Sequence, residues 1–479
     1  MSIKTHEVVE GVRSALSWHS HVVQGATMII AASILGTVAV AVSPAQATTP
    51  AGDLAGTWEG PLAVGGQSIR IVFRIRPDGT AVMDSPDQGA RDIPVETPTV
   101  EGGVVRLTVP ALGGRFEGRR SDDGAVLTGV LSQGGVTLPL VLTRMSATVA
   151  ELVRPQNPLP PYPYRAEEVA FDNANAPGVR LAGTLTLPQG NGPFPAAILI
   201  SGSGPQDRDE TVFGHKPFAV WADALTRRGI AVLRYDDRGT AGSTGEFAAA
   251  TSADFATDAD AAFAYLAARP EIDGRRIGLI GHSEGGTIAP LVAQEGVPVA
   301  WVVMLAGPAV SGGALLTEQS RVTQVAMGIA PAVVDSNVAI QARIMSAVEE
   351  NASSADATIA AVDAVLADAG LSVAQRQEQA RQTGSAWTRW FIAHDPGPAL
   401  AGLDVPLLAL YGGKDVQVPA DQNAPVLSRL KPDAEVVVLP DLNHLMQPAV
   451  TGLPNEYEAI ETTIAPQALS TVVDWVVAR

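Results

Sequence analysis

The sequence predicts an α/β protein with a mostly parallel sheet, preceded by a small all-β domain. After about residue 165, continuous apolar runs alternate with helical patterns. Strands that are apolar on both faces belong to parallel sheets covered by helices on both sides. Before residue 150, short strands are separated by Gly-Gly or Asp-Gly pairs. The chain has 479 residues, of which 46% are hydrophobic, so it can bury the cores of two domains.

The first 47 residues are predicted to be a removable export signal. Lys4 and Arg13 lie in a polar start, residues 26–42 are apolar, and Ala45-Gln46-Ala47 forms an A-x-A cleavage pattern. The alternative is an uncleaved membrane anchor, because the apolar run approaches spanning length. Its Ala, Gly and Thr content and the A-Q-A site favour cleavage. We therefore expect an exported protein, periplasmic or secreted, with no stable membrane span after the signal is removed.

Residues 48–150 are predicted to form an all-β accessory domain, either a small barrel or a sandwich. The stretch IRIVFRI (69–75) alternates apolar and polar residues, and three similar strands follow at 104–110, 125–131 and 136–143. Residues 52–145 contain no histidine, so base or metal chemistry is not expected there. Residues 151–165 include PQNPLPPYP, whose five prolines predict a semi-rigid extended linker.

Residues 166–479 are predicted to form the α/β domain. The stretch at 180–188 alternates and suits an antiparallel edge strand, and helical patterns cover 253–268 and 465–478. Residues 312–400 are too long for a simple crossover; they predict a helical cap with a break at Asn-Ala-Ser-Ser (351–354). The continuous apolar runs predict six buried strands, at 196–201, 230–235, 277–281, 301–307, 406–413 and 434–440.

The stretch GHSEGG follows the third of these strands and predicts a nucleophile elbow. Gly281 and Gly285 flank Ser283, where a side chain would clash with the neighbouring backbone. The turn lifts the serine hydroxyl above the sheet edge and points the next helix at the reacting centre. The alternative is a tight strand-to-helix turn without chemistry. Pro290, inside the following helix, predicts a local kink or early irregularity.

A serine nucleophile needs a base and an acid, which follow it in the order acid, then histidine. His215 precedes Ser283, His282 adjoins it and should point away, and His394 lies in the cap. His444, directly after the strand at 434–440, is therefore the candidate base, although a lone histidine is often only a structural group.

Asp415 follows the preceding strand in a Gly-Gly-Lys-Asp loop and is the candidate acid. Asp441 is its rival, and the structural alternative for Asp415 is a turn cap.

Acyl transfer also needs backbone N–H donors for the developing oxyanion. Glu284, the residue after the nucleophile, should supply one of them. The loop Gly202-Ser203-Gly204-Pro205 should supply the second, with Ser203 preferred and Gly204 next. The alternative is an ordinary glycine-rich loop.

Two charged clusters and one aromatic group complete the candidate site. The clusters follow strands at the active edge, and we expect Arg208 or Arg238 to pair with their carboxylates and brace the loops. The aromatic residues either line an acyl or alcohol pocket or pack the cap. The bracing residues are Asp207, Arg208, Asp237 and Arg238, and the aromatic residues are Trp387, Trp390 and Phe391.

Composition excludes several other functions. A net charge of −18 repels phosphate backbones, so we do not expect nucleic-acid binding; acidic surfaces also serve solubility alone. The chain has no cysteine, hence no disulfide, no thiolate metal site and no cysteine nucleophile. It has no HExxH, phosphate-binding loop or dinucleotide fingerprint, so neither a metal nor an organic cofactor is expected.

These motifs together resemble the α/β-hydrolase superfamily, and more narrowly bacterial esterases related to serine aminopeptidase-type hydrolases with an N-terminal β accessory domain. The motifs are ISGSGPQDRDE (200–210), RYDDRGTAGSTG (234–245), GHSEGG (281–286), YGGKDVQVP (411–419) and LNHLMQ (442–447). The resemblance covers about 165–479 and implies a Ser283–Asp415–His444 triad that cleaves small-molecule esters. Many relatives begin the oxyanion motif with His-Gly, whereas this chain has Ser201-Gly202.

Two other functions stay open on the sequence. A peptidase acting on short or acylated peptides would use the same triad, with an acidic loop holding the substrate's amino group. A non-catalytic binding protein would use the β domain as ligand holder beside a degenerate hydrolase domain. The intact Ser, Asp and His argue against the second.

Overall fold

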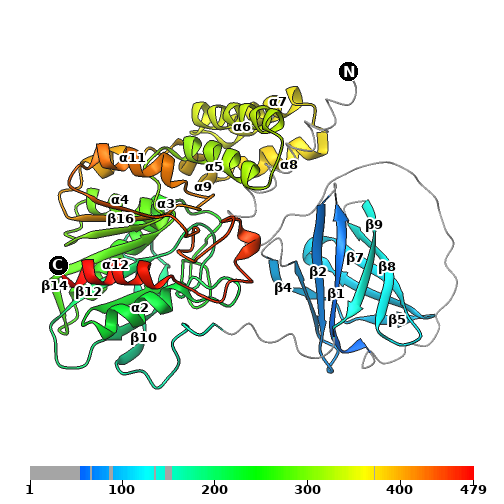
Figure 1. The fold of residues 1–479 in the computed structure, drawn as a ribbon, viewed down its shortest axis with the longest axis horizontal. Coiled ribbons are helices and arrows are strands. Elements are labelled where there is room, and N and C mark those ends of the chain that lie inside the picture. Colours follow the sequence, from blue (N-terminus) through cyan, green and yellow to red (C-terminus); the bar gives the residue numbers. More distant parts are fainter. Residues whose placement is uncertain (1–53, 65–66, 86–89, 134–135, 146–153, 372) are drawn as a thin grey trace. The chain divides into compact units, whose positions relative to one another are not determined.

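The computed structural model describes residues 54–479, apart from 65–66, 86–89, 134–135, 146–153 and 372 (Figure 1). The contacts divide this part into two units, residues 54–145 and residues 154–479. The first is all-β and the second is α/β, which confirms the predicted fold class. The predicted export signal lies outside the described residues.

The first unit is one antiparallel sheet of nine strands, in the order β4-β3-β2-β1-β9-β8-β7-β6-β5. The sheet curves into a half-barrel, and the Glu96 N–H, directly after β4, donates to Thr108 O of β6 at 2.9 Å. The strands are β1 Gly56–Val64, β2 Gln67–Ile75, β3 Ala81–Ser85, β4 Ala90–Val95, β5 Thr99–Glu101, β6 Val104–Val109, β7 Gly114–Arg120, β8 Val126–Gln133 and β9 Val136–Arg144.

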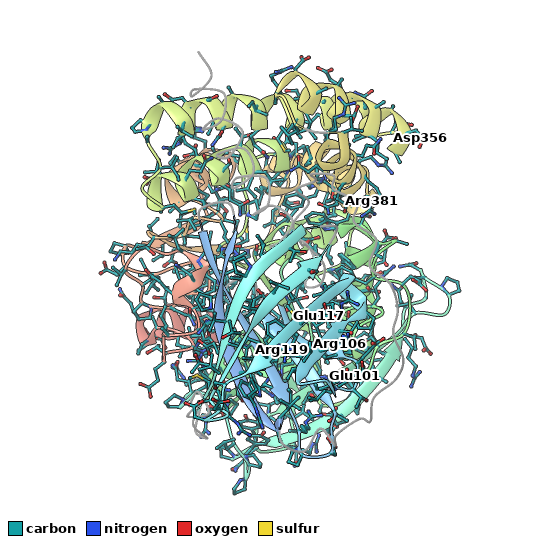
Figure 2. All side chains as sticks on the ribbon, turned by 90° about the vertical axis from the view of Figure 1, so that its right-hand side faces the viewer. Glu101, Arg106, Glu117, Arg119, Asp356 and Arg381 are labelled. Atoms are coloured by element: carbon teal, nitrogen blue, oxygen red, sulfur yellow. The ribbon has the colours of Figure 1, made fainter. Side chains whose placement is uncertain are left out.

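Strand alternation places an apolar core on the concave side of this sheet. Trp58, Phe73 and Phe116 are fully buried there, and the Trp58 indole N–H donates to Leu54 O at 2.8 Å. The opposite face is charged: Arg106 bridges Glu101 and Glu117 across neighbouring strands, at 2.7 and 2.8 Å (Figure 2). Such exposed pairs contribute little to stability and serve mainly solubility.

The second unit is built on an eight-stranded sheet in the order β10-β11-β13-β12-β14-β15-β16-β17. β11 is antiparallel to both of its neighbours, and the later strands run parallel. The strand predicted at 180–188 is antiparallel, but β10 and not β11 lies at the edge. The strands are β10 Arg165–Asp172, β11 Arg180–Leu187, β12 Phe194–Ile200, β13 Ala231–Tyr235, β14 Ile272–His282, β15 Val302–Leu305, β16 Leu407–Gly412 and β17 Glu435–Leu439.

Helices cover both faces of this sheet, so β15 and β16 are buried along their whole length and β14 is buried from Ile277 to His282. α2 (Pro217–Arg227) and α12 (Pro466–Val477) pack on one face, whereas α3 (Ser252–Ala267), α4 (Gly285–Gln294) and α11 (Ala420–Leu430) pack on the other (Figure 1). Trp301 and Trp475 meet edge to face at 6.2 Å between the sheet and α12.

The predicted cap is helical. Its second and third helices, α6 and α7, are separated at residues 352–354, where the sequence predicts a break. Figure 1 shows α5 to α8 stacked to one side of the sheet. The six helices are α5 Gly312–Ala326, α6 Pro331–Asn351, α7 Ala355–Asp368, α8 Val373–Thr383, α9 Ala386–Ala393 and α10 Gly397–Ala401.

The described part of the proline-rich linker contains neither helix nor strand up to residue 164, as its prolines predict, and β10 begins at Arg165. The start of the linker is docked on the α/β unit. Arg154 is buried and donates to the carbonyls of Phe213 (2.8 Å) and Ile460 (2.6 Å). Gln156 accepts from the N–H of Thr463 at 2.6 Å. Residues 154–157 therefore belong to the α/β unit and are not a free spacer.

Candidate active site

The elbow serine lies between β14 and α4 in a strained backbone conformation. Ser283 has φ +53°, a region that non-glycine residues enter at a cost and that clusters at functional sites. A Cβ at Gly281 would lie 1.9 Å from the carbonyl oxygen of Gly285, and one at Gly285 would lie 2.2 Å from that of Ile200. Both glycines are therefore required by close backbone approach, as the sequence predicts.

Two features hold the elbow at the sheet edge. The Ser283 N–H donates to Leu305 O at 2.8 Å, which continues the pairing of β14 with β15. β12 and β14 run parallel with Ile200 opposite Gly281, so the loop after β12 begins beside the elbow. Helix α4 runs without interruption through Pro290, whereas the sequence predicts an irregularity there.

Asp415 and His444 meet beyond the ends of β16 and β17. Both are buried, and Asp415 Oδ2 lies 2.8 Å from Nδ1 of His444. The other oxygen, Oδ1, accepts the N–H groups of Gln417 (2.7 Å) and Val418 (2.9 Å). Asp415 thus caps its own turn and contacts the imidazole. The side chain of Asp441, its rival in the sequence, is 82% exposed.

His282, the residue before Ser283, contacts the backbone of His444. His282 Nε2 lies 3.1 Å from His444 O, and the two imidazole centroids are 4.8 Å apart. Within the described chain, the Ser283 hydroxyl makes no hydrogen bond to His444 or Asp415. Contacts of catalytic groups are often long without substrate and tighten in the complex.

The remaining described histidines occupy structural positions. His215 is fully buried, with its ring nitrogens 2.8 Å from Thr463 Oγ1 and 3.2 Å from Tyr457 O. Burial, assisted by a nearby guanidinium, lowers the pKa of His215 to about 4, so it is neutral near pH 7. His394 lies at the end of α9 and stacks on Trp390, with centroids 4.2 Å apart.

The loop after β12 presents backbone amides beside the elbow. The N–H of Gly202 is already engaged, because it donates to Glu210 Oε1 at 2.8 Å. Ser203 and Gly204 are then the next amides of the loop that can face a substrate. Glu284 lies at the N-cap of α4, and the first amides of a helix have no partner within the helix.

The side chain of Glu284 joins the elbow to the cap. It is 2% exposed and accepts from the Ser252 hydroxyl at 2.6 Å and from the Trp387 indole at 2.8 Å. Burial raises the pKa of Glu284, and the hydrogen bonds from Ser252 and Trp387 oppose that effect. Helix α9 of the cap is thus fixed directly over the residue that follows Ser283.

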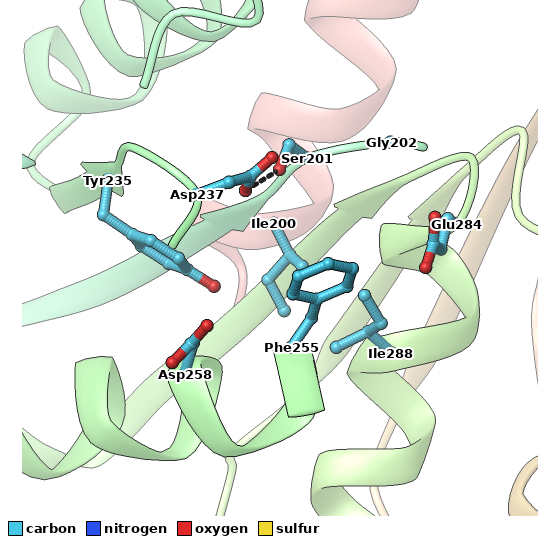
Figure 3. A pocket seen from close by; sticks show the side chains of 9 residues that line it. All are labelled: Ile200, Ser201, Gly202, Tyr235, Asp237, Phe255, Asp258, Glu284 and Ile288. Atoms are coloured by element: carbon cyan, nitrogen blue, oxygen red, sulfur yellow. Dashed lines mark hydrogen bonds between the residues drawn. The ribbon is translucent and has the colours of Figure 1, made fainter. Parts of the chain in front are cut away.

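Of the three aromatic candidates, Trp387 comes nearest the elbow. Its ring stacks on Phe391 with centroids 4.8 Å apart, while Trp390 stacks on His394. A cavity of about 10 Å³, the space of one water molecule, lies beside the start of the loop after β12 (Figure 3). None of the three aromatic residues lines it. Its walls are Ile200, Ser201, Gly202, Tyr235, Asp237, Phe255, Asp258, Glu284 and Ile288.

The two arginines brace the loops, but with partners that differ in part from those expected. Arg208 pairs with Asp236 at 2.7 Å. Arg238 pairs at 2.7 Å with Asp258 on α3, outside the two charged clusters. Asp237 instead accepts the Ser201 hydroxyl at 2.7 Å and the N–H of Gln206 at 2.8 Å (Figure 3).

Asp207 forms hydrogen bonds within its own loop. Its Oδ2 accepts the hydroxyl of Thr211 at 2.7 Å and its Oδ1 accepts the N–H of Asp209 at 3.1 Å, so it caps its own turn. Short-range hydrogen bonding by aspartate explains this placement.

Arg238→Ala is expected to lower the free energy of unfolding by about 3 kcal/mol, because it leaves the carboxylate of Asp258 buried without its charge partner. Arg238 is 6% exposed and Asp258 is 2% exposed. Urea unfolding of the full chain measures the change. The control is Arg275→Ala, since the Arg275 side chain is 93% exposed and its loss should change stability by less than about 0.5 kcal/mol. Equal stability of the two variants would contradict the bracing role of Arg238.

Sequence reasoning missed a second buried histidine–carboxylate contact. Glu210 Oε1 lies 2.7 Å from His282 Nδ1, and both side chains are buried. Glu210 belongs to the DRDE cluster and adopts φ +53°. The sequence offered two signals for this contact: an acidic residue in the loop after a central strand, and a histidine beside the nucleophile. The two residues are 72 positions apart, so no local pattern connects them.

Among the residues that the structure describes, no group of three or more His, Cys, Asp and Glu side chains is arranged to hold a metal ion. The same residues include no helix that is both long and apolar enough to cross a bilayer.

The chain is similar to one protein family, to a curated relative and to solved structures. A family described as serine aminopeptidase, S33, matches residues 216–447. The esterase EstD of Thermotoga maritima is 29% identical over 271 residues, which cover 56% of this chain and 58% of that protein. The chain thus spans less than two thirds of that relative. A solved Pyrococcus furiosus esterase is 15% identical, with a TM-score of 0.39, over 65% of this chain and 92% of its own.

Proposed function

With an α/β-hydrolase unit that resembles serine aminopeptidases and the esterase EstD as the premise, we propose that this protein is an exported serine hydrolase of small carboxylic esters. One observation carries the proposal: a strained serine on a glycine elbow lies at the same sheet edge as a buried Asp415–His444 pair. Nucleophile, base and orienting acid are the three parts that acyl transfer requires.

In the proposed reaction, His444 Nε2 takes the proton of the Ser283 hydroxyl while the oxygen attacks the ester carbonyl. Asp415 accepts the Nδ1–H of the imidazole, which leaves Nε2 free as the base, and it stabilises the imidazolium that forms. The N–H groups of Glu284 and Ser203 bind the oxyanion, with Gly204 as the alternative to Ser203.

The imidazolium then gives its proton to the leaving alcohol, and an acyl-enzyme remains on Ser283. His444 next removes a proton from water, whose oxygen attacks the acyl carbonyl, and the acid is released as the serine regains its proton. The same two backbone donors serve both tetrahedral intermediates, because both form at the same carbonyl carbon.

A peptidase is the second candidate, since ester and amide hydrolysis share these groups and the matching family is described as serine aminopeptidase. The Asp237 and Glu284 carboxylates beside the elbow offer negative charge for a substrate amine (Figure 3). Against this, burial raises the pKa of both groups and favours their neutral forms.

Short-chain p-nitrophenyl esters are expected to give at least about tenfold higher kcat/KM than aminoacyl p-nitroanilides, a difference of about 1.4 kcal/mol. Steady-state rates on the two series, measured with one preparation of the protein without its first 47 residues, make the comparison. Faster turnover of anilides would assign the site to a peptidase. Acetyl and butyryl esters in the same panel indicate the preferred acyl length.

Export is proposed from the sequence pattern at residues 1–47 alone. N-terminal sequencing of the protein secreted or released from the periplasm should begin at Thr48. A protein that keeps its first residues in the membrane fraction would favour the anchor.

A further inference from the structure

A buried pair beside the proposed triad connects three of its parts. Glu210 Oε1 lies 2.7 Å from His282 Nδ1 and accepts the Gly202 N–H at 2.8 Å. On the other side of the ring, His282 Nε2 lies 3.1 Å from the carbonyl oxygen of His444. The pair therefore touches the oxyanion loop, the nucleophile strand and the loop that carries the base.

The proton count of this arrangement follows from its acceptors. A carbonyl oxygen only accepts, so Nε2 of His282 must carry a hydrogen to bond His444. An ionised carboxylate also only accepts, so the 2.7 Å contact with Glu210 requires a second proton between Oε1 and Nδ1. Whichever atom holds that proton, the pair has one proton more than a neutral imidazole beside a carboxylate.

Loss of this proton removes one of the two contacts. The remaining imidazole hydrogen then points either to Glu210 or to His444 O, and the other side of the ring faces an acceptor with a lone pair. Since the pair is buried, water does not readily replace the missing donor. The first outcome loosens the loop that carries His444, which we call the base loop. The second turns the His282 ring away from the Glu210 carboxylate, which holds the Gly202 amide.

We propose that Glu210 and His282 are a positioning pair, which holds the base loop and the oxyanion loop together and releases them when the pair loses its second proton. The inference rests on the proposed esterase function of Ser283. Neither side chain needs to touch the substrate, because both act through the backbone of Gly202 and His444.

The charged surroundings favour the protonated pair near neutral pH. Burial alone would lower the pKa of His282, but the Glu210 carboxylate, the His444 carbonyl and the more distant Asp415 together raise it above its ordinary value. Besides Glu210 and Asp415, the titratable group that faces His282 is the imidazole of His444. A raised pKa means that the contacts are intact at lower pH and are lost as pH rises through it. Activity should therefore fall on the alkaline side.

Glu210→Gln tests the pair, because it keeps the shape of the side chain and removes its charge. The alkaline decline of kcat should move to lower pH by about one unit or more, since an adjacent opposite charge shifts a pKa by about that much. In His282→Gln, the amide can donate to His444 O but does not titrate. Its kcat at pH 7 should fall about 10–100-fold through misplacement, and the alkaline decline should disappear.

The control is Glu246→Gln, an exposed charge removal in the same unit, which should leave the pH profile as in the wild type. Unchanged alkaline profiles in both Glu210→Gln and His282→Gln would overturn the inference, as would a wild-type profile without an alkaline decline. Ser283→Ala distinguishes failure of this inference from failure of the proposed function. If this variant hydrolyses esters at the wild-type rate, the proposed function fails, whatever the pH profiles show.

A measurement on the wild-type protein covers the case in which neither variant folds. In ¹⁵N-histidine NMR spectra, the imidazole of His282 should lose its second proton at higher pH than a histidine of ordinary pKa, because the Glu210 carboxylate raises its pKa. A His282 imidazole that loses this proton in or below the ordinary histidine range would overturn the inference.

Discussion

Ser283→Ala is expected to lower kcat for ester hydrolysis by about 10⁵-fold or more, the loss typical of removing a serine nucleophile. The alanine variant has no oxygen to form the acyl-enzyme, while the donors for the oxyanion remain in place. The residual rate should come from those donors and from substrate binding alone. Steady-state kinetics on a short p-nitrophenyl ester measure the loss, with KM expected to change little.

Ser428→Ala is the matched control for that variant. Ser428 lies exposed on α11 and its hydroxyl only bonds Ala424 O at 2.9 Å in its own helix. Its removal should leave kcat within about twofold of the wild type, because surface substitutions away from special features have small effects. A Ser283→Ala protein that folds and keeps more than a tenth of the wild-type rate would contradict the role of Ser283.

Asp415→Asn should lower kcat by about 10⁴-fold through the wrong histidine tautomer. Asp415 Oδ1 accepts from Gln417 and Val418. In the variant these two amides hold the amide oxygen of Asn in the same place, so its NH₂ group must face His444. The imidazole then accepts at Nδ1 and carries its hydrogen on Nε2, where it cannot take the proton of Ser283.

Asp441→Asn provides the comparison, because Asp441 is the nearest rival acid in the sequence. Its exposed side chain lies 3.9 Å from Lys414 Nζ, and we expect nearly wild-type kcat. Pre-steady-state bursts on both variants separate loss of acylation from loss of product release. A larger loss in Asp441→Asn than in Asp415→Asn would move the acid to the loop of His444.

Much of the α/β unit could be predicted because each strand of a covered parallel sheet is apolar on both faces. Four central strands, β12, β14, β15 and β16, follow from such runs alone. The elbow could be predicted as well, since the steric demand on Gly281 and Gly285 is local and appears in the sequence as small residues around a serine.

Other features depend on contacts between distant segments and leave only weak local patterns. The edge strand β10 is mostly exposed and polar, so no apolar run reveals it. Arg238 pairs with Asp258 and not with carboxylates that are nearer in the sequence, because α3 packs beside the loop and brings Asp258 within reach. The Glu210–His282 contact joins the loop after β12 to the end of β14, and only the strand order of the sheet brings these segments together.

The sequence predicts that the first unit is all-β, but it does not predict how many strands the unit has. β1 and β3 contain glycine, proline or aspartate residues that interrupt the alternation expected of a strand, and β7 has only one large apolar side chain, Phe116. They form because neighbouring strands supply backbone partners on both sides. Tertiary pairing therefore overrides weak local propensity at these positions.

Labelling with a fluorophosphonate probe, followed by peptide mass spectrometry, tests the central claim most directly. An activated serine should form one covalent adduct, on the peptide that contains Ser283, and Asp415→Asn should slow its formation. A folded protein that forms no adduct, or one that reacts at another serine, would contradict the account and favour a non-catalytic binding role.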